Sequence, residues 1–88
     1  MELDLVESAL IRFGAREAYA FAVSEAASQT LAAAISGTGD VAQLRRRLRS
    51  EYGEHMTPTR IHVLDRLPRL ASGKVDRAEV LRVCRKYR

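Results

Sequence analysis

The sequence contains no tryptophan and no asparagine, it has one cysteine, and only two of its 15 basic residues are lysines. The single cysteine, Cys84, excludes an internal disulfide and a cysteine-rich zinc site. No uninterrupted apolar run approaches the roughly 20 residues that a membrane-spanning helix requires. Met1 is followed by Glu2-Leu3-Asp4, whereas a secretory signal begins with basic residues and continues as an apolar run. We therefore expect a cytoplasmic protein with no membrane partner.

The length of 88 residues fits one domain, which we expect to span residues 1–88. A chain of this size buries roughly 60–65% of its unfolded surface, which is enough for one modest core. It is too short for a complete (β/α)8 barrel or a full dinucleotide-binding fold. Apolar residues make up 47% of the chain and charged residues 30%, which is typical of a folded globular protein rather than a disordered one.

Charge is divided unevenly along the chain. Residues 1–40 contain six acidic and two basic residues, whereas residues 41–88 contain five acidic and 13 basic residues. A basic half is typical of proteins with anionic partners such as phosphate, nucleotides or nucleic acid. Four arginines at positions 45, 46, 47 and 49 could form a nucleic-acid patch, with Tyr52 stacking on a base. We favour a solvated helix face whose arginine stems cover apolar surface, which leaves a nucleic-acid partner as a remote alternative.

Apolar periodicity predicts six elements in the order α-β-β-α-β-α. The first is a helix over Glu2–Phe13, in which Glu7 can face water. Its apolar residues fall on one face, and they are Leu5, Val6, Ala9, Leu10 and Phe13. Two strands follow as a hairpin, over Glu17–Ser24 and Gln29–Ser36. In the first strand bulky residues alternate with alanines, which favours a helix packed closely on the alanine side.

A turn at Gly37-Thr38-Gly39 precedes the second helix. Asp40 is its predicted N-cap, with Gln43 as the capping-box partner, and Gly53 ends it. The turn also matches the G-x-G-x-x-A pattern of dinucleotide-binding proteins, which Ala42 completes. A second parallel βαβ half does not fit in this chain, so a plain turn is the better interpretation.

The third strand is predicted over Arg60–Leu64 and is followed by a loop over Asp65–Lys74. Asp76 then caps the last helix, with Glu79 three residues on. The buried side of that helix is expected to consist of Val80, Leu81, Cys84 and Tyr87. The expected fold class is α+β, a small three-stranded sheet with helices packed on it.

The loop before the last helix is the most informative segment. Gly73-Lys74 lacks the upstream glycine and the following Ser or Thr of a P-loop. A lysine on a loop is well placed to reach into a site elsewhere, although most surface lysines are simply solvated. His55 and His62 lack acidic partners at metal-ligand spacing, so we expect no metal site.

The sequence from Leu67-Pro68 through Gly73-Lys74-Val75-Asp76-Arg77 resembles the last core motif of the adenylate-forming ligases, L-P-x-x-x-x-G-K-V-D-R. These ligases include acyl-CoA synthetases, luciferases and the adenylation domains of nonribosomal peptide synthetases. Three more segments, Glu2–Leu10, Gly14–Ala18 and His55–Pro58, are similar to family motifs in the same order. Asp4-Leu5 replaces the usual Gly-Glu. The resemblance is to the small, mobile C-terminal subdomain, which is itself α+β.

The resemblance implies that Lys74 is the catalytic residue, which bridges the substrate carboxylate and the phosphate and ribose oxygens of the nucleotide. The supporting residues of its loop are Leu67, Pro68, Ser72, Gly73, Asp76 and Arg77. Gly73 would let the backbone bend, and Asp76 would anchor the far end of the loop. ATP with Mg, and CoA or phosphopantetheine, would be bound only together with an N-terminal adenylation subdomain, which this sequence does not contain. We therefore expect no activity from the chain alone.

Two main hypotheses follow from the resemblance. In the first, the chain is the mobile subdomain of a carboxylate-adenylating ligase and works with an N-terminal subdomain in cis or in trans. In the second, it is a free-standing interaction module of the same fold that docks a carrier protein or a synthetase. The carboxylate substrate would be selected by the missing subdomain.

Overall fold

The computed structural model describes residues 3–25, 28–37 and 40–86. Its elements are α1 (Leu3–Arg12), β1 (Glu17–Glu25), β2 (Ser28–Ser36), α2 (Val41–Tyr52), the short 3-10 helix η1 (Glu54–Met56), β3 (Arg60–Val63) and α3 (Arg77–Lys86). This order confirms the predicted α+β class, to which it adds η1. The predicted turn at Gly37-Thr38-Gly39 and the predicted burial of Tyr87 fall wholly or partly outside the described residues.

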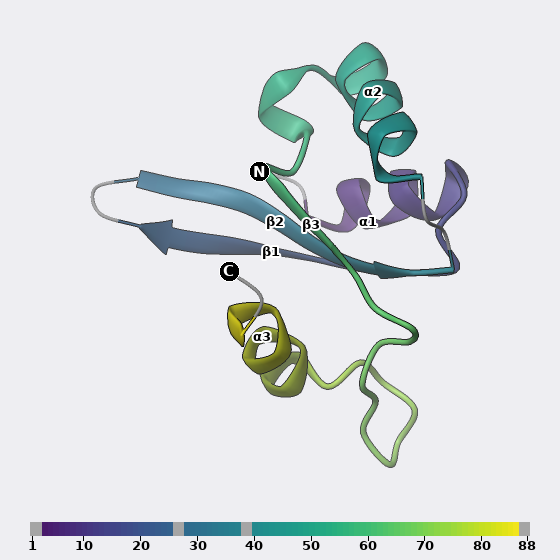
Figure 1. Ribbon diagram of the computed structural model, residues 1–88, viewed down its shortest axis with the longest axis vertical. Helices are drawn as coiled ribbons and strands as arrows, with labels where there is room; N and C mark the ends of the chain where they lie inside the picture. Colours follow the sequence, from purple (N-terminus) through teal and green to yellow (C-terminus); the bar gives the residue numbers. More distant parts are fainter. Residues whose placement is uncertain (1–2, 26–27, 38–39, 87–88) are drawn as a thin grey trace.

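The three strands form one sheet in the order β1-β2-β3. β1 and β2 are an antiparallel hairpin whose register pairs Glu17 with Ser36 at one end. β3 runs parallel to β2, so the chain must cross over between them, and α2 with η1 forms that connection. Figure 1 shows the hairpin extending past the helices, with α1 and α2 on one face of the sheet and α3 on the other.

The central strand β2 is buried on both faces from Leu31 to Ile35, which explains the unbroken apolar sequence of that stretch. Leu31, Ala33 and Ile35 belong to the core that includes α1 and α2. Ala32 and Ala34 belong to a second core that includes α3. Because alanine is small, α3 can lie close to this face of the sheet.

The alternation in β1 is confirmed. Ala20 packs in the core cluster that contains Val6, Ala9 and Leu10 of α1, so a helix does cover the alanine side. Phe21, on the opposite side, belongs to the cluster that contains Val80 and Cys84 of α3. The two helical layers therefore pack against different side-chain sizes of one strand.

Two predictions for the first helix were wrong. Leu5 is 41% exposed, because the helix face that packs on the sheet is the narrower stripe of Val6, Ala9 and Leu10. Glu7 is half-buried rather than solvated, and its carboxylate accepts a hydrogen bond of 2.8 Å from the Ala20 N–H. Since β1 is an edge strand, this bond satisfies a backbone donor that β2 does not reach.

Helices α1 and α3 have 10 residues each, and α2 has 12. None of them is long and apolar enough to cross a membrane.

Candidate functional site

The loop after β3, which we call the lysine loop (residues 65–76), is closed at its base by contacts with the core and with itself. Leu67 is 2% exposed and packs in the same cluster as Val80 of α3. The Pro68 carbonyl accepts a hydrogen bond of 2.8 Å from the Asp76 N–H. Arg69 and Val75 form an antiparallel bridge beside this bond. The base of the loop is therefore a short two-stranded stem rather than two unpaired segments.

The tip of the loop is a tight hairpin. The Leu70 N–H donates to the Lys74 carbonyl at 2.8 Å, and the Gly73 N–H donates to the Leu70 carbonyl at 2.9 Å. Ala71, Ser72 and Gly73 lie between these two ends. Gly73 has a φ of +95°, a region that glycine adopts at little cost and that a three-residue hairpin loop often requires at this position.

Lys74 follows directly after the tip and is exposed, as are Ser72 and Gly73. Among the residues that the structure describes, none forms a hydrogen bond or an ion pair with its ammonium group. Leu70, at the other end of the tip, is 49% exposed. The loop therefore presents a cation and an apolar side chain to whatever approaches this end of the domain.

The predicted N-caps of the last two helices are confirmed. Asp76 Oδ1 accepts a hydrogen bond of 3.2 Å from the Glu79 N–H at the start of α3. Asp40 Oδ1 accepts one of 3.0 Å from the Gln43 N–H in α2. A cap of this kind satisfies a backbone donor that has no partner inside the helix. Asp76 thus ties the end of the lysine loop to α3, and Arg77 is the first residue of that helix, with an exposed side chain.

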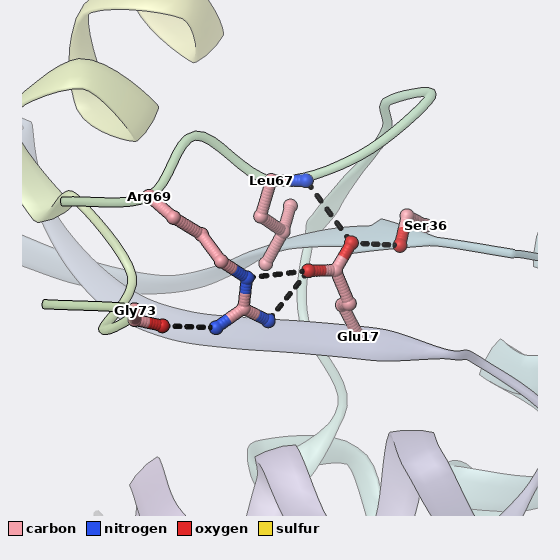
Figure 2. Close-up of polar contacts among 5 residues, drawn as sticks. All are labelled: Glu17, Ser36, Leu67, Arg69 and Gly73. Carbon is pink, nitrogen blue, oxygen red and sulfur yellow. Dashed lines mark hydrogen bonds and ion pairs between the residues drawn. The ribbon is translucent and has the colours of Figure 1, made fainter. Parts of the chain in front are cut away.

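Glu17 binds the lysine loop to the sheet, as Figure 2 shows. One carboxylate oxygen, Oε1, accepts hydrogen bonds from the Ser36 hydroxyl at 2.6 Å and from the Leu67 N–H at 3.1 Å. The other, Oε2, accepts from Nε and Nη2 of Arg69 at 3.0 and 2.5 Å. The remaining Arg69 nitrogen, Nη1, donates to the Gly73 carbonyl at 2.8 Å. We call Glu17, Ser36 and Arg69 the loop anchor.

The environment of the loop anchor keeps Glu17 ionised. The hydrogen bond from Ser36 and the interactions with Arg69 and Leu67 stabilise the carboxylate, whereas burial opposes its charge. The balance lowers the pKa of Glu17 from 4.5 to about 2. At neutral pH the loop is therefore held by a permanent negative charge whose side chain is only 15% exposed.

Sequence reasoning missed this anchor. In the sequence, Glu17 is only the first residue of a predicted strand and part of the segment Gly14–Ala18, and Arg69 occupies a variable position of the loop motif. The two residues are 52 positions apart, so no local pattern connects them. The one available signal is that the acidic Glu17 directly precedes the apolar run of residues 18–23.

The arginine-rich helix α2 is largely engaged within the domain. Arg45 donates to the carbonyls of Pro58 and Thr59 in the segment before β3. The guanidinium carbon of Arg47 lies 4.3 Å from the centroid of the Phe13 ring. Arg49 forms an ion pair with Glu54 of η1 at 2.6 Å. These contacts support the interpretation of the arginine run as a helix face that covers its own domain.

In the described ranges no three His, Cys, Asp or Glu side chains are grouped as a metal site would require. His55 is exposed on η1 and His62 is half-buried on β3. Burial and the nearby charge of Arg60 lower the pKa of His62.

The AMP-binding enzyme C-terminal domain family matches residues 5–74 of this chain. The phenyloxazoline synthase MbtB of Mycobacterium tuberculosis is 40% identical over 83 residues, which cover 91% of this chain and 6% of that protein. The MbtB of Mycolicibacterium paratuberculosis is 38% identical over 87 residues, which cover 93% of this chain and 8% of that protein. The chain thus spans less than a tenth of the length of these curated relatives.

Solved structures show the same fold. A four-domain nonribosomal peptide synthetase bound to AMP and glycine matches with a TM-score of 0.80 and 28% identity, over 89% of this chain and 6% of that one. The amide bond synthetase McbA from Marinactinospora thermotolerans matches with a TM-score of 0.82 and 24% identity, over 94% of this chain and 18% of that one. An acyl-CoA synthetase from Brucella canis has a TM-score of 0.77 at 23% identity, over 98% of this chain and 18% of that one.

Proposed function

Because this chain belongs to the AMP-binding enzyme C-terminal domain family, we propose that it is the mobile C-terminal subdomain of a carboxylate-adenylating ligase and that Lys74 acts in adenylate formation. The observation that carries the proposal is the setting of Lys74. An exposed ammonium group without a described partner follows the tip of a loop that is itself tied to the sheet. Such a cation is available to an anionic site on another body.

The chemistry of adenylation explains why a cation is needed. A carboxylate oxygen attacks the α-phosphorus of ATP, the bond from that phosphorus to the bridging oxygen breaks, and pyrophosphate leaves with the electron pair. The carboxylate and the phosphate are both anionic, so their approach is repulsive and charge grows on the phosphate oxygens. Lys74, brought in by closure of the subdomain, would neutralise that charge. One preorganised donor of this kind contributes about 10²–10³ in rate.

The remaining parts of the site would come from an N-terminal adenylation subdomain, in cis or in trans. That subdomain would bind ATP and the carboxylate. The described part of this chain offers no cluster of ligands for Mg, which would be bound with ATP in the N-terminal subdomain. A carrier protein with its phosphopantetheine arm, or CoA, is the acceptor that we propose for the second half-reaction, since a nonribosomal peptide synthetase and an acyl-CoA synthetase share this fold.

The test is a chimera in which this chain replaces the matched 83-residue segment of the MbtB synthase of M. tuberculosis. Carboxylate-dependent pyrophosphate exchange is measured with the substrate that the intact synthase activates. We expect Lys74→Ala to lower the exchange rate by about 10²–10³. Lys86→Ala, which removes the other lysine of the chain, is the matched control and should stay within about twofold.

Equal exchange by Lys74→Ala and the unaltered chimera would show that Lys74 has no part in adenylation. A chimera that exchanges pyrophosphate at the rate of a synthase lacking the segment altogether would favour the free-standing interaction module instead. In that case, capture of a carrier protein by the chain should be the same with and without Lys74.

A further inference from the structure

We propose that Glu17 is a positioning residue for Lys74, and that it acts through Arg69. The inference rests on the proposed role of Lys74 and adds to it the device that would place the lysine. It assigns a function to a residue that lies in the first strand of the domain, 57 positions before the lysine along the chain.

A short covalent and hydrogen-bonded path connects the two residues. Glu17 is fixed on the sheet by its strand, and its carboxylate holds two nitrogens of Arg69. The third nitrogen of the same guanidinium donates to the Gly73 carbonyl at 2.8 Å. That carbonyl belongs to the peptide group whose nitrogen is the backbone nitrogen of Lys74. Arg69 therefore links the sheet, through the Gly73 carbonyl, to the peptide group that joins Gly73 to Lys74 (Figure 2).

The planar shape of the arginine side chain is essential to this path. A guanidinium presents its N–H groups in a fixed fork, so that one side can hold a carboxylate while another meets a carbonyl. A lysine at position 69 would keep the charge but could not present that geometry. The structure thus predicts that Arg69→Lys, although conservative in charge, loses the positioning.

The exposed tip of the loop needs contacts that fix its position relative to the sheet. Its tip and the two flanking residues, Leu70 and Lys74, are exposed, and Gly73 adds backbone freedom. The Leu67 N–H also depends on Glu17 as its acceptor. Without the carboxylate the tip keeps its own two hairpin bonds but loses the polar contacts that connect it to the sheet. A displacement of about 1 Å of a catalytic group can lower a rate about 10²-fold.

The experiment is a double-mutant cycle in the MbtB chimera described above, with pyrophosphate exchange as the readout. We expect Glu17→Gln and Arg69→Lys each to lower the exchange rate by about 10- to 100-fold. We expect the two together to cost no more than either one, because both interrupt the same path. Arg66→Gln, which removes an exposed arginine of the same loop, is the control and should leave the rate within about twofold.

The decisive comparison places Glu17→Gln in a Lys74→Ala background. If Glu17 acts by positioning Lys74, its substitution costs less than about twofold once the lysine is gone. A loss of the same size with and without Lys74 would mean a general effect on folding and would overturn the proposal. Amide hydrogen exchange on the 88-residue chain gives a second readout, in which Glu17→Gln should increase the exchange of the Leu67 N–H, whose acceptor is the Glu17 carboxylate, at least tenfold.

The two proposals fail in different ways. If Lys74→Ala abolishes exchange while Glu17→Gln and Arg69→Lys retain the full rate, Lys74 keeps its role and the positioning path is wrong. If Lys74→Ala retains the full rate, the proposed function itself fails and the path has no catalytic lysine to position.

Discussion

Acid should weaken this domain through Glu17, and replacing that residue with glutamine should remove the effect. The pKa of Glu17 falls from 4.5 to about 2 on folding, so the folded state favours the ionised form. A lowered carboxyl pKa contributes stability that is complete above pH 4.5 and is lost as the pH falls toward 2. The unfolded chain binds this proton first, and that difference drives the loss.

The size of the effect follows from the shift. A change of about 2.5 pKa units corresponds to about 3 kcal/mol as an upper limit. The side chain of Arg69 is 45% exposed, so solvent screens part of the interaction. We therefore expect Glu17 to contribute about 1–2 kcal/mol to the free energy of unfolding at pH 7, and close to nothing at pH 2.

The assay is urea unfolding of the wild-type chain and Glu17→Gln at several pH values between 7 and 2. The other carboxylates titrate in both proteins, so the difference between the two isolates Glu17. Glu54→Gln is the matched control, because Glu54 also pairs with an arginine but its side chain is 76% exposed. Its difference from wild type should stay within about 0.5 kcal/mol. A Glu17→Gln difference that does not change between pH 5 and pH 2 would refute the assigned pKa and the anchor with it.

Two further substitution pairs test the packing around the lysine loop by thermal unfolding. Leu67→Ala should lower the free energy of unfolding by about 2–4 kcal/mol, because the residue is 2% exposed. Leu70 is 49% exposed, so Leu70→Ala should change it by less than about 0.5 kcal/mol. Equal costs for the two substitutions would contradict the proposed stem. Gly73→Ala meets open space at a φ of +95° and should cost about 1–2 kcal/mol from backbone strain alone. Gly37→Ala should cost about 1–3 kcal/mol more than Gly73→Ala, since its Cβ would lie 2.4 Å from the Cβ of Arg16. A larger cost for Gly73→Ala would show that backbone strain, and not this contact, determines the loss of stability.

The elements of this fold could be predicted because each leaves a local pattern. The alternation of alanine with larger residues in β1 and the caps at Asp40 and Asp76 depend on neighbours within a few positions. Periodicity also placed Val6 and Leu10 correctly in the core. It failed for Leu5 because a helical period shows which residues share a face, but not how wide a strip of that face the sheet covers.

The loop anchor could not be predicted, for a physical reason. Ser36 reaches Glu17 because the hairpin register places them opposite each other, and that register is a property of the whole strand pair. Arg69 reaches Glu17 only after the crossover helix α2 has returned the chain to the sheet and Leu67 has packed beneath α3. Each of these steps depends on tertiary packing, so no window of sequence contains the information.

The division of the basic residues between arginine and lysine now has a structural explanation. The arginines at positions 45, 49 and 69 each bind a carbonyl or a carboxylate of their own domain, a role for which the planar fork is suited. An arginine at position 74 would have the same tendency to bind the carbonyls of its own loop. A lysine has a compact charge on a flexible stem and no such fork, so it can remain unengaged until an anionic group arrives. The scarcity of lysine therefore fits the proposal that the domain uses its arginines to hold itself together and presents Lys74 to a partner.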